Sequence, residues 1–458
     1  MPAKLKRSNL ADDDSARGRA INRYKDKLFN EANSLPDNLE LNVEFLGAFN
    51  LLENTRDPVF VSGKAGTGKS TLLKYFRTHT SKNVVVLAPT GVAAINVGGQ
   101  TIHSFFRFPP RLIQKDTIRR RRNAKIIKKL DMVIIDEVSM VRADLMDGID
   151  YALRINRDQM DVPFGGAQVV FFGDLFQLPP VVEAQAQEIL ARNYESPYFF
   201  NANVFDQISL RYIELTKIYR QSDAKFINIL NQIRSKEHTE EELGVLNERV
   251  RERIPQDLAH CVILTTTNYR ANTINEERLV SLSADVVTHD ATTTGAFDAS
   301  AYPTEFSLKL KRGAQVILIK NDPDKRWVNG TIAEIAAVFP GCIEVCIGEN
   351  VYEVPRVTWE KIQYEYNGAQ EKIEEHVVGT FEQYPLKLAW AITIHKSQGQ
   401  TFDNVIIDLG FGAFTHGQVY VALSRCRSLE GIILKRKVYE SDIIFDERIY
   451  EFRDRLLA

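Results

Sequence analysis

The sequence has few cysteines, no long apolar run and almost no net charge. Its four cysteines are too few and too scattered for a disulfide framework or a zinc site, so we expect a reducing compartment. No apolar run reaches the roughly 18 residues of a membrane-spanning helix, and the N-terminus lacks the apolar core of a signal peptide. The net charge of −2 does not indicate nucleic-acid binding as a bulk property, so any polyanion site must be a local groove. The cysteines are Cys261, Cys342, Cys346 and Cys426.

The composition is otherwise that of a globular protein with several domains. Of 458 residues, 44% are hydrophobic and 26% are charged, as in soluble proteins with sizeable cores. This length predicts about two to four domains. Residues 1–36 are polar and charged and are expected to form an arm, whereas the apolar spacing in 41–52 predicts a helix.

The clearest motif lies in residues 57–75, DPVFVSGKAGTGKSTLLKY, which predict a strand at Val59–Val61, a glycine-rich loop, and a helix from about Lys69. The loop matches the G-x-x-x-x-G-K-[ST] pattern of nucleoside triphosphate sites. Its glycines let backbone N–H groups close on a polyphosphate, and the helix N-terminus adds its positive dipole end. Lys69 can reach the outer phosphates, and the Ser70 hydroxyl can hold Mg²⁺. The residues expected at the nucleotide are Gly63, Ala65, Gly66, Thr67, Gly68, Lys69, Ser70 and Thr71.

Strands and helices alternate from residue 57 to about 215. Short β-branched or aromatic runs of this kind predict a buried parallel sheet. Polar motifs follow three of the strands, and ligands of such sheets gather at the carboxyl ends of strands, so these motifs should line one crevice with the phosphate loop. The predicted strands are Val59–Val61, Val84–Leu87, Met132–Ile135, Val169–Phe172 and Tyr212–Leu215. The motifs are APTG (88–91), DEVS (136–139) and GDLFQLPP (173–180).

Two carboxylates, Asp136 and Glu137, directly follow the apolar run MVII. An acidic residue at a strand end beside a phosphate loop can hold Mg²⁺, and a second one can orient and deprotonate the attacking water. We assign Asp136 to the metal and Glu137 to general base catalysis. The alternative is that the pair merely caps the following helix.

The second half of the chain predicts another α/β domain, interrupted by strands. It begins near residue 205 and resumes near 386, with strands at Val262–Thr265, Val405–Ile407 and Ile432–Leu434. Residues of about 280–380 instead show alternating patterns and tight turns, which indicate a small inserted β-barrel.

Aromatic and basic residues gather between the two first polar motifs. Phe105, Phe106 and Phe108 stand beside a Pro-Pro turn and could stack on bases or separate strands, although a buried hydrophobic loop is an equal alternative. The run Arg119–Arg122 could contact phosphates, but such a run is more often a solvated face.

The ordered set of motifs resembles superfamily 1 DNA helicases of the petite-integration-frequency (Pif) and RecD-like branch, which includes the phage Dda enzyme. The resemblance covers residues of about 57 to 435. The motifs are GKAGTGKST (63–71), APTGVAA (88–94), TIHSFF (101–106), IIDEVSM (134–140), FFGDLFQLPPV (171–181), YRQ (219–221), WVNGT (327–331), AITIHKSQGQTFD (391–403) and VYVALSRCRSLEGI (419–432).

The resemblance implies an α/β fold with two RecA-like domains, whose parallel sheets are flanked by helices, and ATP in the cleft between them. The first domain would span 37–204, with a wedge or pin insertion at about 105–128. The second would span 205–280 and 381–458, with an SH3-like β-barrel inserted at 281–380. ATP and Mg²⁺ are the expected cofactors, and movement on single-stranded DNA is expected to run 5′ to 3′.

The resemblance also assigns further site residues by position. Gln177 would sense the γ-phosphate or the hydrolytic water, and Arg220 and Arg425 would be arginine fingers, alongside Lys69 and Glu137. One well-placed finger is worth about 10³–10⁵ in rate. The positions implied at DNA are Thr90, Thr101, His103, Thr265, Asn268, His395, Lys396 and Ser397, with Phe105, Phe106 and Phe108 as stacking candidates.

One position departs from the family pattern. The family has a Gln that reads the adenine edge, in a context like Leu-Asn-x-x-Gln, where this chain has Phe45. Either base selectivity is looser here or another group, such as Asn42, reads the base. We therefore expect measurable use of GTP.

The favoured interpretation is an ATP-dependent 5′-to-3′ DNA helicase. The first alternative is a single-strand translocase that displaces proteins but unwinds poorly, and a nucleotide-dependent DNA clamp without turnover is weaker. Expected partners are single-stranded DNA, tailed or forked duplex and, as a further candidate, G-quadruplex or RNA–DNA hybrid. We expect a monomer without DNA. The short flanks indicate a bacterial or viral source, hence the cytoplasm at the nucleoid.

Overall fold

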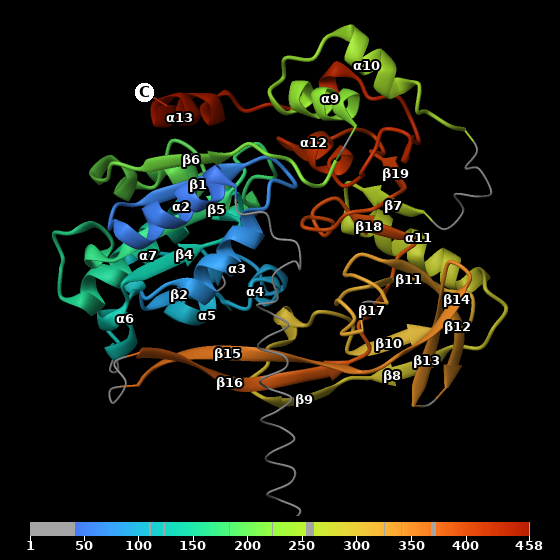
Figure 1. The fold of residues 1–458 in the computed structure, drawn as a ribbon, viewed down its shortest axis with the longest axis horizontal. Helices are drawn as coiled ribbons and strands as arrows, with labels where there is room; N and C mark the ends of the chain where they lie inside the picture. The colour runs from blue at the N-terminus through green and yellow to red at the C-terminus, as the bar shows by residue number, and fades with distance from the viewer. Residues whose placement is uncertain are drawn as a thin grey trace, which may run out of the picture.

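The computed structural model describes residues 42–109, 111–121, 124–182, 184–221, 223–252, 261–324, 326–339, 341–367 and 372–457. Two parallel sheets organise these residues, one in each half of the molecule (Figure 1). The expected N-terminal arm (1–36) lies outside the described residues. Within the part that is described, no helix combines the length and the apolar character that crossing a membrane requires.

The first sheet has six strands in the order β3-β2-β4-β5-β1-β6, all parallel. Every strand predicted there is confirmed: β1, β4 and β5 are buried along their whole length and β2 along most of it, as short apolar runs predict, whereas β6 is a more exposed edge strand. The strands are β1 (Val59–Gly63), β2 (Val84–Ala88), β3 (Gln100–Thr101), β4 (Met132–Ile135), β5 (Gln168–Gly173) and β6 (Arg211–Leu215). Because β6 pairs with β1, the expected start of the second domain near residue 205 falls before a strand that still belongs to the first sheet.

Helices cover both faces of this sheet. Alternate residues of each strand point to opposite faces, so Val59 and Val61 pack with α2 (Val43–Asn54) and α3 (Lys69–His79). The predicted helices at 41–52 and from Lys69 are thus confirmed. The other helices of this half are α4 (Gly91–Asn96), α5 (Ile102–Phe106), α6 (Lys125–Lys129), α7 (Ala143–Arg157) and α8 (Ala184–Asn193). Phe60 points to the opposite face from Val59 and Val61, into a core that includes residues of α5, α6 and α7.

The second sheet is smaller, with four parallel strands in the order β18-β7-β19-β20. Its three predicted strands are confirmed. The strands are β7 (Val262–Thr265), β18 (Ala391–Thr393), β19 (Val405–Asp408) and β20 (Ile432–Leu434). The helices are α9 (Ala224–Arg234), α10 (Glu240–Asn247), α11 (Asn268–Ser281), α12 (Gln418–Leu423) and α13 (Glu447–Leu457).

The last helix, α13, crosses back to the first domain (Figure 1). Its Phe452 stacks on Phe200 with ring centroids 4.3 Å apart and belongs to the same core as Phe60 of the first sheet. The expected assignment of 381–458 to the second domain is therefore incomplete, since the apolar face of α13 is buried by the first.

Antiparallel strands replace helices between the two parts of the second sheet, as the alternating pattern of 280–380 predicts. A five-stranded sheet in the order β14-β13-β12-β11-β17 encloses its own core, and a pair β10-β8 lies beside it. An SH3-like topology stays a prediction. The strands are β8 (Val287–Asp290), β9 (Thr292–Gly295), β10 (Ser307–Leu310), β11 (Gln315–Leu318), β12 (Ile332–Phe339), β13 (Cys342–Ile347), β14 (Asn350–Val354), β15 (Val357–Asn367), β16 (Lys372–Gln383) and β17 (Leu386–Leu388).

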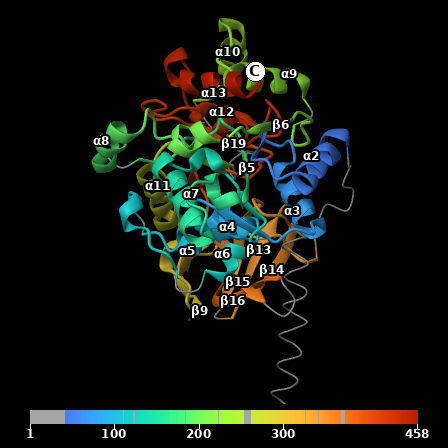
Figure 2. The same cartoon turned by 90° about the vertical axis from the view of Figure 1, so that its left-hand side faces the viewer.

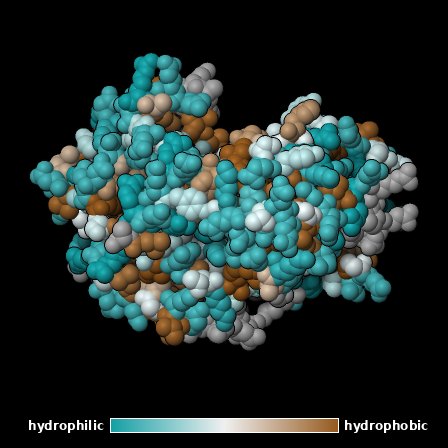
Figure 3. All heavy atoms as spheres, turned by 90° about the horizontal axis from the view of Figure 1, so that it is seen from above, coloured by the Kyte–Doolittle hydropathy of each residue, from teal (hydrophilic) through white to brown (hydrophobic). Residues whose placement is uncertain are grey.

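The hairpin β15–β16 extends from this insertion beneath the first domain (Figures 1 and 2). There the Val86 N–H donates to the Tyr364 hydroxyl at 3.2 Å, and the Tyr364 ring meets Phe105 edge-on. Through these contacts, the insertion of the second domain also packs against the first domain. Seen from above, the side away from this hairpin, the surface is mostly hydrophilic, with hydrophobic residues in small patches (Figure 3).

Candidate functional site

The phosphate loop joins β1 to α3, as its pattern predicts. Gly66 and Gly68 adopt left-handed backbone angles, with φ of 82° and 88°. A Cβ at Gly66 would also lie 2.4 Å from Cβ of Arg220, so only glycine fits there. The Lys69 ammonium donates to the carbonyl oxygens of Gly63 at 2.6 Å and Lys64 at 3.1 Å, which holds the cation over the loop.

The two carboxylates after β4 lie beside this lysine. Burial and the neighbouring Glu137 charge raise the pKa of Asp136 to about 7. Burial likewise raises the pKa of Glu137, although the charges of Lys69, Arg425 and Arg220 oppose that shift. Glu137 has a left-handed φ of 50°, which is uncommon for a residue with a side chain. Asp136 is buried and Glu137 half-buried, and when both are ionised they place two adjacent negative charges beside Lys69.

The arginines predicted as fingers face these groups from the other half. Arg220 Nη1 donates to the Ser424 carbonyl at 3.3 Å, and Arg425 Nη2 donates to the Ser424 hydroxyl at 2.8 Å. Burial, and then the like charge of Arg220, lowers the pKa of Arg425 to about 9. Only 1% of Arg425 is exposed. Arg425 is buried and Arg220 half-buried, and within the described residues both donate to carbonyl or hydroxyl oxygens, so the pair suits an anion in this cleft.

Gln177 also lies between the halves. Its Nε2 donates to Asp174 Oδ2 at 3.4 Å, and its Oε1 accepts from Gln398 Nε2 at the same distance. Gln398 follows the HKS motif of the second half. A side chain that touches both halves is suitably placed for the sensing role that the resemblance implies.

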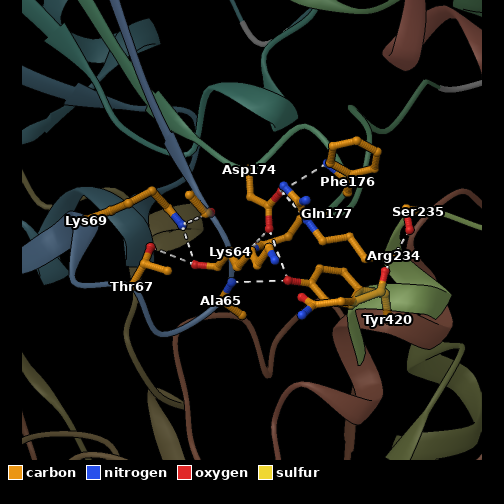
Figure 4. A network of polar contacts seen from close by, with 12 residues as sticks. Lys64, Ala65, Thr67, Lys69, Asp174, Phe176, Gln177, Arg234, Ser235 and Tyr420 are labelled. Atoms are coloured by element: carbon orange, nitrogen blue, oxygen red, sulfur yellow. Dashed lines mark hydrogen bonds and ion pairs between the residues drawn. The ribbon is translucent and has the colours of Figure 1, made fainter. Parts of the chain in front are cut away.

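Three functional residues were missed in the sequence: Asp174, Arg234 and Tyr420. They form a buried polar network with the phosphate loop (Figure 4). Arg234 Nη2 donates to Asp174 Oδ1 at 3.0 Å, and the Tyr420 hydroxyl donates to Asp174 Oδ2 at 3.3 Å. Asp174 and Tyr420 lie inside motifs quoted for the family resemblance, FFGDLFQLPPV and VYVALSRCRSLEGI, so both could have been picked out from the sequence. Arg234 lies in none of these motifs.

Asn42, the residue offered as an adenine reader, and Phe45, which stands where the family has its Gln, both make structural contacts. Asn42 caps α2, because its Oδ1 accepts from the Phe45 N–H at 2.8 Å, and its Nδ2 donates to the Tyr219 hydroxyl at 3.1 Å. Phe45 is 6% exposed and packs edge-on against Tyr75. The hydrocarbon ring at position 45 thus completes the core between α2 and α3.

The residues implied at DNA differ in how their side chains are presented. Thr90 and Thr101 cap α4 and α5 through their hydroxyl oxygens, at the carboxyl ends of neighbouring strands. Thr265 and Ser397 are fully buried, and each hydroxyl donates to a nearby carbonyl. Exposed side chains are those of Thr90, Asn268 and Lys396, while Thr101, His103 and His395 are half-buried. Burial lowers the pKa of both histidines.

The three phenylalanines do not form an exposed wedge. Phe105, Phe106 and Phe108 are 3%, 6% and 8% exposed, and Phe106 stacks on Phe108. The interpretation of these rings as base-stacking groups is wrong for this structure, and the alternative of a buried hydrophobic loop is correct. The physical reason is that Tyr364 of β15 packs on Phe105 and all three rings belong to the core that includes α7.

The arginine run is also partly structural. Arg120 pairs with Asp158 at 2.5 Å, and Arg121 Nη1 donates to the Phe105 carbonyl at 3.0 Å. Arg122 lies outside the described residues.

Comparisons with known proteins agree with this geometry. A family model described as PIF1-like helicase matches residues 45–243, and one described as UvrD-like helicase C-terminal domain matches 388–430. The ATP-dependent DNA helicase Pif1 of Bdellovibrio bacteriovorus is 32% identical over 408 residues, which are 86% of this chain and 88% of that protein. Against the longer mouse and human PIF1 proteins, the chain spans 57% of their length.

Solved structures match over nearly the whole chain. Unliganded Pif1 from Bacteroides is 39% identical, with a TM-score of 0.83 over 92% of this chain and 98% of that one. The Bacteroides Pif1 complex with ADP-AlF3 and single-stranded DNA is 39% identical, with a TM-score of 0.67 over 91% and 97%. Bacteroides Pif1 in complex with ADP-AlF4 also matches with a TM-score of 0.83, so the domain arrangement described here is nearer to that of the unliganded and ADP-AlF4 structures than to that of the complex with DNA.

Proposed function

The chain belongs to the PIF1-like helicase family, and on this premise we propose that it is an ATP-driven DNA helicase that moves 5′ to 3′ along single-stranded DNA and unwinds the duplex ahead. The observation that carries the proposal is the composition of the cleft. Lys69 and Glu137 of the first half lie within electrostatic reach of Arg220 and Arg425 of the second. The side chains to which we assign phosphate binding, general base catalysis and the finger role thus lie around the same cleft.

Each group has a distinct task in hydrolysis. The loop N–H groups and Lys69 bind the phosphates, and Glu137, whose pKa is raised by burial, orients the attacking water and accepts its proton. Arg220 and Arg425 neutralise the charge that spreads over the γ-phosphoryl oxygens. Because these arginines come from the second half, the site is complete only when the cleft closes. Hydrolysis and domain spacing are then coupled, as a stepping motor requires.

Mg²⁺ fits the acidic side of this site. The excess negative charge at Asp136, with its pKa raised to about 7, would be relieved by a divalent cation. Asp136 and the exposed hydroxyl of Ser70 are the residues proposed to hold it. The ion would polarise the phosphoryl oxygens.

Contacts to DNA are proposed along the carboxyl edges of the two sheets. The exposed Thr90, Asn268 and Lys396 supply a hydroxyl, an amide and a cation, which suit phosphate contacts independent of sequence. Thr101, His103 and His395 are the half-buried candidates. Support comes from the Bacteroides relative, whose structure holds single-stranded DNA.

The burial of Phe105, Phe106 and Phe108 favours the alternative of a single-strand translocase. The rings expected to separate strands are buried, so the described residues around 105–108 offer no aromatic wedge. A motor of this kind would displace proteins from single strands while unwinding poorly. We further propose tailed or forked duplex and G-quadruplex as substrates, a monomer without DNA, and action on the nucleoid in the cytoplasm.

Strand displacement on two partial duplexes tests the function. One carries a 5′ single-stranded tail and the other a 3′ tail, each with ATP and Mg²⁺, and Lys69→Ala serves as the blank. Displacement from the 5′ tail alone is expected. Displacement from the 3′ tail would overturn the polarity, and DNA-stimulated hydrolysis without displacement would support the translocase.

A further inference from the structure

The Tyr420 hydroxyl crosses the cleft and contacts the phosphate loop itself. It accepts a hydrogen bond from the Ala65 N–H at 3.1 Å and donates one to Asp174 Oδ2 at 3.3 Å (Figure 4). Tyr420 belongs to α12 of the second half, whereas Ala65 and Asp174 belong to the first. One side chain therefore joins the loop, the end of β5 and the opposite domain.

The negative charge of Asp174 determines which way the Tyr420 hydroxyl donates its hydrogen bond. The buried Asp174 keeps a lowered pKa because the Arg234 and Lys69 charges outweigh the effect of burial. The carboxylate accepts only, so the Tyr420 proton points toward Asp174 and the oxygen lone pairs face the Ala65 N–H. Burial also raises the pKa of Tyr420, which keeps the hydroxyl protonated. The network thus presents an oxygen acceptor to a loop N–H, as a phosphate does.

One backbone N–H group cannot donate a full-strength hydrogen bond to two acceptors at once. Backbone N–H groups of such loops cradle phosphates, and the Ala65 N–H is engaged with Tyr420 here. Phosphate binding through this group requires the hydroxyl to leave. Tyr420 belongs to α12, and Arg425 stands just after that helix, with its Nε donating to the Val421 carbonyl at 3.0 Å.

We propose that Tyr420 is a positioning residue of the ATPase cycle: it takes the place of a phosphate oxygen at the Ala65 N–H in the nucleotide-free enzyme, and incoming nucleotide displaces it. Asp174 and Arg234 hold Tyr420 in this orientation. Displacement links occupancy of the loop to movement of the segment that carries Arg425. The inference rests on the proposed binding of nucleotide at the phosphate loop.

Tyr420→Phe removes only the hydroxyl, so it tests the competition directly. The Ala65 N–H is then without its partner until nucleotide binds, and the variant should bind fluorescent ADP with Mg²⁺ roughly three- to tenfold more tightly, the effect of one hydrogen bond. KM for ATP should fall by a similar factor. Equal or weaker binding would overturn the proposal, since a merely structural role would loosen the site.

Tyr194→Phe is the matched control. Its hydroxyl donates to Asp147 at 3.2 Å, also a tyrosine–aspartate bond, but within the first domain. ADP affinity should be unchanged in this variant, and an equal gain there would overturn the proposal. Failure of the wild-type protein to bind ADP would instead overturn the proposed function.

Hydrogen exchange on the wild-type protein provides a test that does not depend on folding of a variant. The Ala65 amide should be protected from exchange without nucleotide, because Tyr420 accepts its proton. Fast exchange in the nucleotide-free protein would overturn the proposal. In Tyr420→Phe the same amide should exchange faster without nucleotide and regain protection with ADP.

Discussion

Arg234 and Asp174 form a buried ion pair between the two halves of the protein, with Arg234 Nη2 3.0 Å from Asp174 Oδ1. The guanidinium carbon also lies 4.0 Å from the centre of the Phe176 ring. Because Asp174 follows β5 of the first sheet and Arg234 ends α9 of the second domain, this pair holds the halves together beside the phosphate loop.

Loss of this arginine should destabilise the protein strongly. Arg234→Met keeps the length of the side chain but removes the ion-pair partner of the buried Asp174 and leaves only the more distant Lys69 charge; breaking a buried pair in this way costs about 3–5 kcal/mol. We expect a clear fall in the thermal unfolding midpoint. Arg192→Met serves as the control, because Arg192 and Glu188 pair on the surface, with side chains 73% and 77% exposed. An equal effect of both substitutions would show that burial of the Arg234 pair has no special weight.

Glu137→Gln should abolish turnover and spare ATP binding. The amide cannot accept the proton of the attacking water, and positioned general bases are worth about 10²–10⁴ in rate. Because burial raises the pKa of Glu137, wild-type hydrolysis should decline at a higher pH than for an ordinary glutamate base. Steady-state kinetics and fluorescent-nucleotide binding check both points. Unchanged hydrolysis would refute the assignment of Glu137.

Because of His416, the free energy of unfolding should decrease as the pH falls below about 6.5. Burial lowers its pKa from 6.5 to about 4, and its Nδ1 accepts from the Asp446 N–H at 3.2 Å. The unfolded chain therefore binds a proton that the folded protein refuses. This contribution to stability is complete above pH 6.5 and is lost as the pH falls toward 4.

The loss through His416 is on the order of 3 kcal/mol, since one pKa unit corresponds to about 1.4 kcal/mol. His416→Gln removes the titrating group, so the difference in stability between wild type and variant should shrink or reverse from pH 7.5 to pH 5. Denaturant unfolding at the two pH values measures it. A difference that does not depend on pH would exclude the histidine as the cause.

Hydrolysis should tolerate other purine triphosphates. Phe45 offers no hydrogen bond to a base edge, and the Asn42 amide already caps α2 and contacts Tyr219. We therefore expect measurable hydrolysis of GTP alongside ATP in the presence of single-stranded DNA. Strict dependence on ATP would contradict this and would indicate that another group reads the adenine.

Features that depend on neighbours in sequence were predictable. The strand at Val59–Val61, the glycine loop and the helix from Lys69 follow from residues within one short stretch, because sterics and burial act locally there. That Arg220 and Arg425 lie near the phosphate loop could be expected only from the resemblance to the helicase family. The contact between Phe105 and Tyr364 had no local signal, since the two residues lie far apart in the chain.

The two parallel sheets, the phosphate loop and the acidic strand end could be predicted from the amino-acid sequence, because each depends on a short pattern of residues. The burial of the phenylalanines, the return of α13 to the first domain, and the meeting of Tyr420, Asp174 and Arg234 at the loop became evident from the folded molecule alone. The physical reason is that these contacts join segments separated by dozens to hundreds of residues. Their partners are selected by packing of the whole chain, which no local pattern encodes.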